Sequence, residues 1–514
     1  MGGLSSGLRR ATTTLLASLA LMAGCAVLPS VVDRPPSTTQ VAPPEAPLAV
    51  MARAIVVPNG QSAVRPLIFP DLALDARLDL MRRAQVSLDL QSYMIGNDGT
   101  GRMLLRELRN AAARGVRVRL LLDDLYADGM DDLLLGLAAH PGVEVRVFNP
   151  FAYGRGSSLP RFWHLITDLR RLNHRMHNKL FTADGVVAVA GGRNLADEYF
   201  MQSKDANFID FDLQMTGTVV QQLTRIFDEY WNSERAYPLH TVAANELGAA
   251  ERRELFERMT ERHRTPPPKL GPEPPARDPG FYIAPAGAVA DKPSKAFLAT
   301  YGPAPDTVMS GFVRLLGEAR SEVIVVSPYF IPGKFGIDHM RKMRDAGISL
   351  RVVTNAFGAS DEPLVNIGYE RYRLEMLRMG VQVFEVTSAR LKRDTQLRSA
   401  LGSSAGRLHA KIGFIDRKTF LVGSMNLDAR SAFTNTELGI VVRSPELVQT
   451  LLEVYKIDSG VGVYEVRLKS DGRSIEWVGY DPERDERLEA DPESNWLHRL
   501  RLFLLGLLVP EDLL

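Results

Sequence analysis

The chain has 514 residues, of which 45% are apolar, 8% aromatic and 24% charged, a globular composition with enough length for two domain-sized cores. Lys plus Arg (62) nearly balances Asp plus Glu (61), so the formal charge of +1 excludes the strongly basic proteins that attract nucleic acid over long range. A single cysteine, Cys25, excludes an intramolecular disulfide and a cysteine-based metal site. Any anion-binding site must therefore be local.

The N-terminus has the features of an export signal. Arg9 and Arg10 precede an apolar run that is too short to span a bilayer comfortably, and small residues lie directly before Cys25. This arrangement resembles the bacterial lipobox, in which the cysteine is lipidated and becomes the mature N-terminus. We therefore predict a signal peptide over residues 1–24, lipidation of Cys25, and an exported, membrane-anchored lipoprotein facing the periplasm from the inner or outer membrane. The alternative is an uncleaved anchor with an unmodified cysteine.

Two proline-rich stretches divide the chain. The first predicts an extended tether over residues 25–50, which would space the body of the protein from the membrane. The second, around Pro266–Pro268 and Pro274–Pro275, predicts a linker over residues 263–300. The linker would separate a first lobe, residues 51–262, from a second lobe, residues 301–490.

The two lobes contain the same series of predicted elements. The first has strands over residues 86–93, 115–122 and 142–148, with a helix over residues 101–113. The second has strands over residues 323–329, 347–353 and 380–384, with a helix over residues 310–319. Corresponding strands begin 237, 232 and 238 positions apart, which indicates an internal repeat. We predict two α/β lobes, with mixed sheets flanked by helices, related by a pseudo-twofold axis that gives one shared active-site cleft.

A polar motif occurs once in each lobe. The first copy has His177, Lys179, Asp184 and, after two glycines, Asn194. The second copy has the corresponding residues His409, Lys411, Asp416, Ser424 and Asn426. Both the histidines and the asparagines of the two copies are 232 positions apart, so the copies lie at equivalent places in the repeat.

The residue types of this motif suit phosphate chemistry. In an extended segment, positions i and i+2 point to the same side, so each histidine shares a face with its lysine. Imidazole can act as a nucleophile or as a proton donor, while lysine ammonium and asparagine amide groups can hold phosphate oxygens. Two lobes that face each other would place two imidazoles around one phosphorus atom.

The repeated motif resembles the signature of the phospholipase D superfamily, H-x-K-x4-D-x6-G-S-x-N in two copies, over residues 84–444. The resemblance implies that one histidine attacks phosphorus to form a phosphohistidine while the other acts as acid and base; we assign these roles to His177 and His409. It implies that Lys179, Lys411, Asn194, Ser424 and Asn426 belong to the catalytic and phosphate-binding set, and that Asp184 and Asp416 support the motifs. Glu437 and Asp210 match the acidic residues that orient the histidines. Gly192 departs from the signature, because Ser424 is the residue at the equivalent position.

The resemblance implies neither a metal nor a cofactor. Two features could be misread as metal ligands. His174 lies three residues before His177 but has no acidic or histidine cluster beside it, and the Asp123–Asp124 pair at a strand end is typical of a cap or turn.

Within the superfamily, residues 172–179 and 191–200 are similar to the cardiolipin synthase C branch of bacterial phosphatidyltransferases, which implies transfer of a phosphatidyl group to the glycerol headgroup of a second phospholipid. The expected partners are phospholipids and a membrane surface rather than nucleic acid; the need for an accessory protein and the oligomeric state stay open. The apolar segment over residues 491–514 and the Phe162–Trp163 pair suit a membrane interface, although the segment could instead pack on the body. The alternatives are an exported nuclease with the same catalytic residues and a catalytically silent lipoprotein scaffold.

Overall fold

The computed structural model describes most of both lobes. The described residues are 28–29, 32–152, 154–155, 158–243, 245–261, 280–297, 305–455, 462–480, 486–494, 500 and 504. The predicted signal peptide, Cys25, the proline clusters of the predicted linker and most of the C-terminal apolar segment lie outside these residues.

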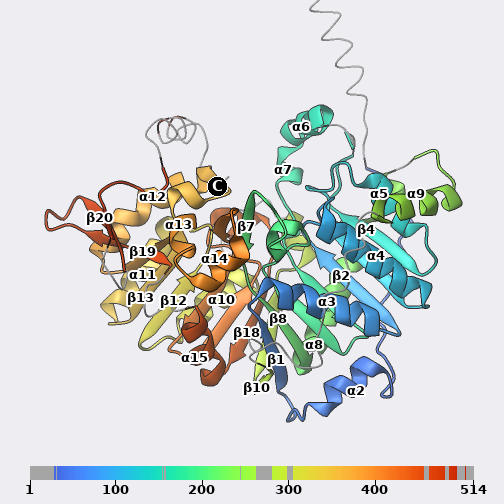
Figure 1. Cartoon of the computed structure of the whole chain (residues 1–514), viewed down its shortest axis with the longest axis horizontal. Coiled ribbons are helices and arrows are strands. Elements are labelled where there is room, and N and C mark those ends of the chain that lie inside the picture. The colour runs from blue at the N-terminus through green and yellow to red at the C-terminus, as the bar shows by residue number, and fades with distance from the viewer. Residues whose placement is uncertain are drawn as a thin grey trace, which may run out of the picture.

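The first lobe is built on a nine-stranded sheet with the order β10-β1-β8-β6-β5-β2-β3-β4-β9 (Figure 1). Its strands are β1 (Ser62–Leu67), β2 (Ser87–Ser92), β3 (Arg117–Asp123), β4 (Val143–Phe148), β5 (Leu180–Ala183), β6 (Val187–Gly191), β8 (Asp212–Gly217), β9 (Ala236–Pro238) and β10 (Tyr282–Ala284). β2, β3 and β4 pair in parallel, whereas the other pairs are antiparallel. The sheet is therefore mixed, as predicted.

The second lobe is built on a ten-stranded sheet with the order β11-β18-β17-β16-β12-β13-β14-β19-β20-β21. Its strands are β11 (Ala286–Ala290), β12 (Glu322–Val326), β13 (Ser349–Asn355), β14 (Gln382–Val386), β16 (Ile412–Ile415), β17 (Thr419–Gly423), β18 (Leu438–Arg443), β19 (Val463–Leu468), β20 (Ile475–Gly479) and β21 (Glu486–Leu488). From β11 to β14 the order and the strand directions repeat those from β1 to β4 in the first sheet. The predicted α/β architecture with two matching lobes is confirmed.

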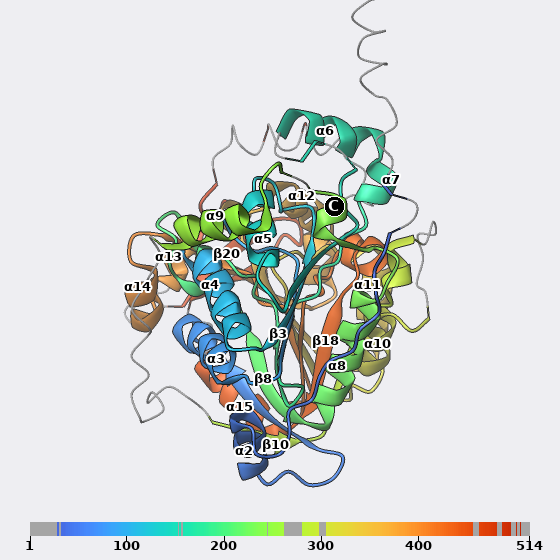
Figure 2. The ribbon, with the colours of Figure 1, turned by 90° about the vertical axis from the view of Figure 1, so that its right-hand side faces the viewer.

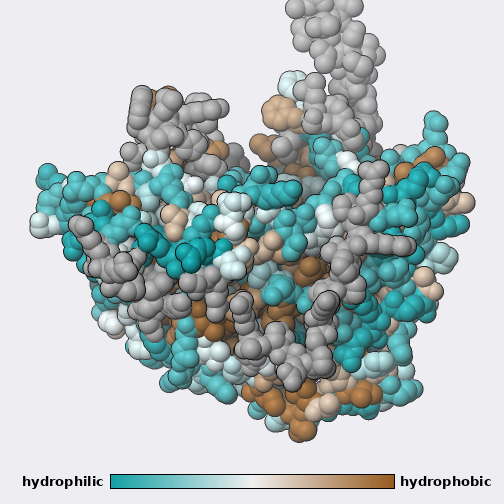
Figure 3. Space-filling view, viewed as in Figure 1, coloured by the Kyte–Doolittle hydropathy of each residue, from teal (hydrophilic) through white to brown (hydrophobic). Residues whose placement is uncertain are grey.

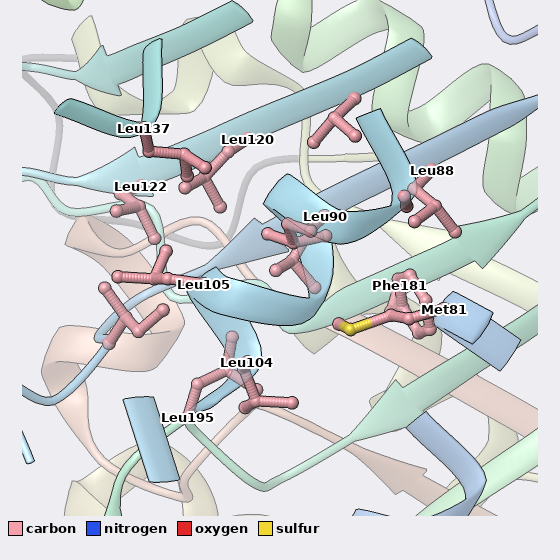
Figure 4. Packing of buried hydrophobic residues seen from close by; sticks show 14 of the residues in the cluster. Met81, Leu88, Leu90, Leu104, Leu105, Leu120, Leu122, Leu137, Phe181 and Leu195 are labelled. Atoms are coloured by element: carbon pink, nitrogen blue, oxygen red, sulfur yellow. The ribbon is translucent and has the colours of Figure 1, made fainter. Parts of the chain in front are cut away.

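Helices cover the outer face of each sheet. On the first sheet these are α3 (Pro70–Arg83), α4 (Gly99–Ala113) and α5 (Asp131–Ala138); on the second they are α10 (Val308–Leu316), α11 (Gly333–Asp345) and α12 (Pro363–Arg378). α4 begins where the Asp98 carboxylate accepts the Gly101 N–H at 2.8 Å, and its apolar face buries Leu104, Leu105 and Leu108, the first two of which are labelled in Figure 4. These side chains belong to the same outer core as Leu90 and Leu120 of the sheet.

The inner faces of the two sheets meet in a shared apolar core. This core contains Leu180 and Leu213 from the first sheet, Ile412 and Ile440 from the second, and the helices α8 (Thr218–Trp231) and α15 (Pro445–Val454) (Figure 2). A parallel pair made by β7 (Ala206–Ile209) and β15 (Ala405–Leu408) also joins the lobes. The lobes are thus held in one fixed arrangement by burial and by backbone hydrogen bonds.

The segment predicted as an extended tether is extended, and its described part is bound to the first lobe. The Thr39 hydroxyl donates to Asp89 at 2.8 Å, and the buried Arg119 guanidinium bridges Asp89 and Asp228 at 2.7 Å each. Residues 47–50 already belong to helix α2 (Pro47–Ala54). The local composition indicated an extended chain but gave no sign of these long-range partners.

The segment predicted as a linker over residues 263–300 is also partly structured. β10 pairs with β1 in the first sheet, and β11 pairs with β18 in the second. The chain thus crosses between the lobes by contributing one strand to each sheet, so the described part of the predicted linker belongs to the lobes themselves.

Candidate active site

Both histidine motifs lie where the two lobes meet. The His177 backbone N–H donates to the Thr436 carbonyl at 2.9 Å, and the His409 backbone N–H donates to the Ile209 carbonyl at 2.8 Å. Each motif then continues into a strand of its own sheet, β5 or β16. Because each acceptor carbonyl comes directly before the acidic residue Glu437 or Asp210, the backbone pairing also brings an acid of one lobe beside the histidine of the other.

The histidines and acids are paired across the lobe boundary. His177 Nδ1 lies 3.0 Å from a Glu437 carboxylate oxygen, and His409 Nδ1 lies 2.6 Å from Asp210 Oδ2. All four side chains are buried. A carboxylate at Nδ1 holds the proton there, so the lone pair of a neutral imidazole is left on Nε2. Sequence analysis predicted these acids, and the structure shows that each serves the opposite lobe.

Charged and ionisable groups of the first motif affect the pKa of the histidine in the second motif. Burial and the Lys411 charge lower the pKa of His409, and Lys179 and His177 lower it further. Burial lowers the pKa of His177 to about 4, against the opposing effect of Glu437. Both rings are therefore neutral near pH 7 in the free protein. The two motifs converge on one electrostatic site, as the sequence predicted.

The two lysines of the site are buried next to their own histidines. Lys179 Nζ donates to the His177 carbonyl at 2.8 Å, and Lys411 Nζ donates to the His409 carbonyl at 2.6 Å. Lys411 Nζ also lies 3.1 Å from His409 Nε2. Burial lowers the pKa of Lys179 to about 7, with a further contribution from Lys411, and lowers the pKa of Lys411 to about 8. An anionic phosphate would relieve this crowding of positive charge.

The lysine pKa values predict the alkaline limb of the activity profile. As pH rises through about 7 to 8, Lys179 and Lys411 lose the protons that give them their positive charge, so kcat/KM should fall, by about tenfold per pH unit for each essential proton. The measurement is kcat/KM at constant lipid composition between pH 5 and pH 10. A rate that stays constant up to pH 9.5 would contradict this role of the lysines.

The asparagines of the motifs also lie near the opposite histidine. Asn194 Nδ2 donates to the Tyr199 hydroxyl at 2.8 Å, and the Tyr199 ring packs edge-on against His409, with 5.1 Å between centroids. The Asn426 backbone N–H donates to Ser431 Oγ at 3.2 Å, and Ser431 in turn donates to Glu437. Both asparagine Oδ1 atoms are buried and have no hydrogen-bond partner among the described residues. These amides thus have unused hydrogen-bonding capacity beside the histidines.

The structure changes our prediction for Ser424. Its hydroxyl donates to Glu437 and accepts the Leu438 N–H at 3.0 Å, and the residue is fully buried. Ser424 is therefore used to hold the orienting carboxylate, not presented to phosphate as predicted. Only the fold shows this difference, because Glu437 lies 13 positions away, directly before the neighbouring strand β18.

The departure of Gly192 from the signature has a steric reason. A Cβ atom at this position would lie 2.1 Å from Asp210 Oδ1, which is far inside van der Waals contact. In the second lobe, the Ser424 hydroxyl and Glu437 occupy this space. In the first lobe, Gly192 has no side chain, so Asp210 occupies it. The two lobes thus use two different residue pairs for the same task.

Gly192→Ser, which restores the signature, is accordingly expected to damage the enzyme. The new side chain must displace Asp210 from His409, so we expect kcat to fall by roughly 10- to 100-fold and stability to fall by about 1–3 kcal/mol. Ser424→Gly is the matched control, because it removes one hydrogen bond without a clash and should cost only about 1 kcal/mol. Steady-state kinetics and thermal unfolding measure both variants; a Gly192→Ser enzyme with unchanged kcat would contradict the steric explanation.

Asp184 and Asp416 hold the motif strands in place, which is the supporting role that the resemblance implied. Asp184 accepts the backbone N–H groups of residues 85–87 at 2.7–3.1 Å, and Asp416 accepts those of residues 320–322 at 2.8–3.2 Å. Both have positive φ, 54° and 51°, at the turn after β5 or β16. Seven residues of extended chain place each about 20 Å from its histidine. They fasten the motif strand to the start of β2 or β12.

Sequence analysis missed the aromatic walls of the site. Tyr93 packs edge-on against His177 at 4.8 Å between centroids, and Lys179 Nζ lies 5.1 Å from the Tyr93 ring centroid. Phe208 packs beside His409 at 4.9 Å. Tyr93 ends the predicted strand over residues 86–93, and that position at a strand end was the only available signal.

The residues weighed as metal ligands have other partners. Asp123 binds Arg175 at 3.0 Å and the Met176 N–H at 2.8 Å, so it positions the chain that leads into the first motif. His174 Nδ1 lies 3.0 Å from the Thr434 carbonyl of the other lobe. Across the described residues, no group of three or more His, Cys, Asp or Glu side chains is placed to hold a metal ion.

Two histidine-lysine motifs that meet between matching α/β lobes define a phospholipase D-type enzyme. A family model described as cardiolipin synthase, PLD-like domain, matches residues 78–231 and 312–458. Cardiolipin synthase C of Escherichia coli (strain K12) is 35% identical over 467 residues, which cover 88% of this chain and 97% of that protein. The chain belongs to the cardiolipin synthase family of phospholipase D-like enzymes.

Other relatives agree with this placement. Cardiolipin synthase B of Salmonella typhi is 24% identical over 381 residues, covering 73% of this chain and 75% of that protein. The crystal structure of phosphatidylserine synthase from Haemophilus influenzae Rd KW20 is similar with a TM-score of 0.56 and 12% identity, covering 90% of this chain and 99% of that one. That likeness supports the fold.

Proposed function

We propose that the protein synthesises cardiolipin by moving a phosphatidyl group from one phospholipid to the glycerol headgroup of another, through a phosphohistidine. The observation that carries the proposal is the crossed pairing of His177 with Glu437 and of His409 with Asp210. The 35% identity to cardiolipin synthase C over nearly the full length of both proteins supports the choice of lipid.

His177 is the proposed nucleophile. Its Nδ1 proton is held by Glu437, which itself accepts hydrogen bonds from Ser424 and Ser431. Although burial opposes it, the interaction with His177 lowers the pKa of Glu437 to about 2, so this acid stays ionised and stabilises the imidazolium that forms. His177 Nε2 forms the bond to phosphorus as the bond from phosphorus to the headgroup oxygen breaks.

His409 is the proposed acid and base. In the free protein the Lys411 ammonium lies against its ring and lowers its pKa. A bound phosphate would draw Lys411 away and favour the protonated ring, which then gives its proton to the leaving alcohol. In the second step His409 takes the proton of the acceptor alcohol, whose oxygen bonds to phosphorus as the bond to His177 breaks. Lys179, Lys411, Asn194 and Asn426 hold the phosphate oxygens throughout.

A projecting helix supplies a candidate membrane contact. α6 (Ser158–Thr167) and α7 (Leu169–Leu172) stand out from the first lobe in both ribbon views, and apolar side chains gather on this projection (Figures 1, 2 and 3). Phe162 and Trp163 are each 57% exposed. Arg161 anchors the helix by donating to the carbonyls of Asp124 and Leu125, next to Tyr126, whose ring packs on Tyr93 of the site. The exposed aromatics are thus connected to the catalytic site.

Replacing both Phe162 and Trp163 with serine should weaken binding to phosphatidylglycerol vesicles at least tenfold. Each aromatic side chain contributes about 1.5–3 kcal/mol when it leaves water. Phe335→Ser is the matched control, because Phe335 is 47% exposed on α11 of the second lobe. Vesicle cosedimentation measures the effect; equal binding by the double variant and the wild type would remove α6 from the membrane contact.

The lipid anchor is a further part of the proposal. Lipidation of Cys25 after cleavage of residues 1–24 would hold the enzyme on a membrane facing the periplasm. In the described part of the chain, no helix combines the length and apolar character needed to cross a bilayer. Mass spectrometry of the mature N-terminus tests the modification.

Lipid mass spectrometry after expression in a bacterial strain that lacks its own cardiolipin tests the proposed reaction. New cardiolipin that disappears in the His409→Ala variant is the expected result. New phosphatidic acid in place of cardiolipin would mean that water is the acceptor. Purified enzyme that degrades plasmid DNA and leaves phospholipid vesicles unchanged would replace the proposal with a nuclease.

A further inference from the structure

The second lobe contains an apolar pocket directly behind its catalytic motif. The pocket has a volume of about 70 Å³ and lies between α10 and the outer face of the second sheet. Of its lining residues, only Ser327 and Lys411 have polar side chains, and Lys411 is the motif lysine that contacts His409. An otherwise hydrocarbon-lined space is therefore bordered by the lysine of the second motif.

In the first lobe, buried charged side chains lie at the equivalent place. Asp212 pairs with Arg77 of α3 at 2.9 Å and with Arg193 at 3.1 Å, and all three are buried. Phe181, two residues after Lys179, packs in the same outer core.

The repeat identifies the corresponding residues of the second lobe. Asp212 faces Gly191 in the register of β8 with β6, and Gly439 faces Gly423 in the register of β18 with β17. By the same 232-residue offset, Arg193 corresponds to Met425 and Phe181 to Gly413. Arg77 lies on α3, eight residues before the first residue whose N–H donates to Asp184. Phe312 lies on α10, eight residues before the first residue whose N–H donates to Asp416, so Arg77 and Phe312 also correspond. An ion network and a phenylalanine are thus replaced by two glycines, a methionine and a phenylalanine, all of which line the pocket.

We propose that this pocket receives hydrocarbon from an acyl chain of the phospholipid whose phosphate lies at Lys411. The inference rests on the proposed function. An apolar cavity holds no ordered water and offers no hydrogen bond to a polar ligand. Each methylene group that moves from water into such a cavity strengthens binding by roughly fourfold. The volume is roughly that of two water molecules, so the pocket holds about two or three methylene-sized groups. The acyl chain of the donor phospholipid would then lie on the second-lobe side of the phosphate that both lobes hold.

Replacing two glycines of the pocket with alanine would fill part of it without a steric clash. A Cβ atom at Gly311 would lie 3.6 Å from Val289 Cγ1, and one at Gly439 would lie 3.5 Å from Val308 Cγ1. Both distances are ordinary van der Waals contacts, so the double variant Gly311→Ala/Gly439→Ala should fold. Gly287 in β11 is the matched control, because it is outside the lining and an added Cβ would meet only Gln222 Oε1 at 3.8 Å.

The test compares kcat/KM for dipalmitoyl and diacetyl phosphatidylglycerol in mixed detergent micelles, because an acetyl group has too little hydrocarbon to fill the pocket. In the double variant the preference for the long-chain lipid should fall about tenfold, through a lower dipalmitoyl value and an unchanged diacetyl value. Gly287→Ala should keep the wild-type preference. Thermal unfolding of each variant shows whether it is folded.

The outcomes separate the two proposals. A wild-type enzyme that converts neither lipid would overturn the proposed function itself. If the wild type is active and the folded double variant keeps its chain-length preference, or loses activity equally on both lipids, the pocket does not bind acyl chains.

Discussion

Replacing His177 or His409 with alanine is expected to reduce phosphatidyl transfer by at least about a thousandfold. The first change removes the atom that bonds to phosphorus, and the second removes the group that moves the proton to and from the alcohol. Because the two rings lie in one site, the double variant should be little worse than either single variant. Turnover of phosphatidylglycerol in vesicles measures the effect, and substantial activity in His409→Ala would exclude the two-histidine scheme.

A trapping experiment separates the roles of the two histidines. Enzyme quenched during turnover of phospholipid labelled in the phosphatidyl group should carry the label on His177, and His177→Ala should carry none. A label on His409 would reverse our assignment. The absence of any label, with transfer intact, would favour direct displacement. A trapped phosphohistidine would also exclude a silent scaffold.

Glu437→Gln is expected to lower kcat by roughly a thousandfold. The amide keeps the shape of the side chain but removes the charge that balances the His177 imidazolium, and its NH2 group can hold the wrong tautomer. Ser431→Ala is the matched control, because it removes one hydrogen bond to Glu437, at 2.7 Å, and leaves the charge in place. We expect that control to lose less than tenfold.

The pH profile of the same variant distinguishes an orienting role from a merely structural one. In the wild type burial lowers the pKa of His177 to about 4, and the Glu437 charge opposes this effect of burial. Without that charge the ring binds a proton less readily, so the acidic limb of kcat/KM should move to lower pH while the alkaline limb set by the lysines stays. An acidic limb that does not move would contradict the pairing of Glu437 with His177.

The repeated motifs were predictable because strand patterns and equal spacings can be recognised from the order of the residues alone. Period-two patterns over residues 115–122 and 347–353 indicated strands, and the equal spacing of His177 from His409 and of Asn194 from Asn426 indicated a duplicated site. The acids Glu437 and Asp210 were also found, through the resemblance. The aromatic walls at Tyr93 and Phe208 were not found. An aromatic residue in a strand or at its end is usually part of the hydrophobic core, and the sequence does not show which residues of the other lobe it contacts.

The sequence by itself determined that there are two α/β lobes, two histidine-lysine motifs and a phosphodiester-type site, because periodicity and spacing survive in one dimension. The tertiary structure alone decided that Glu437 serves His177 and Asp210 serves His409, over separations of 260 and 199 residues. It also decided that Ser424 holds a carboxylate and that an apolar pocket lies behind the second motif, where the equivalent place in the first lobe holds a buried ion network. These outcomes depend on how two sheets pack through a shared core, where the length of one side chain determines which neighbour fills the remaining space.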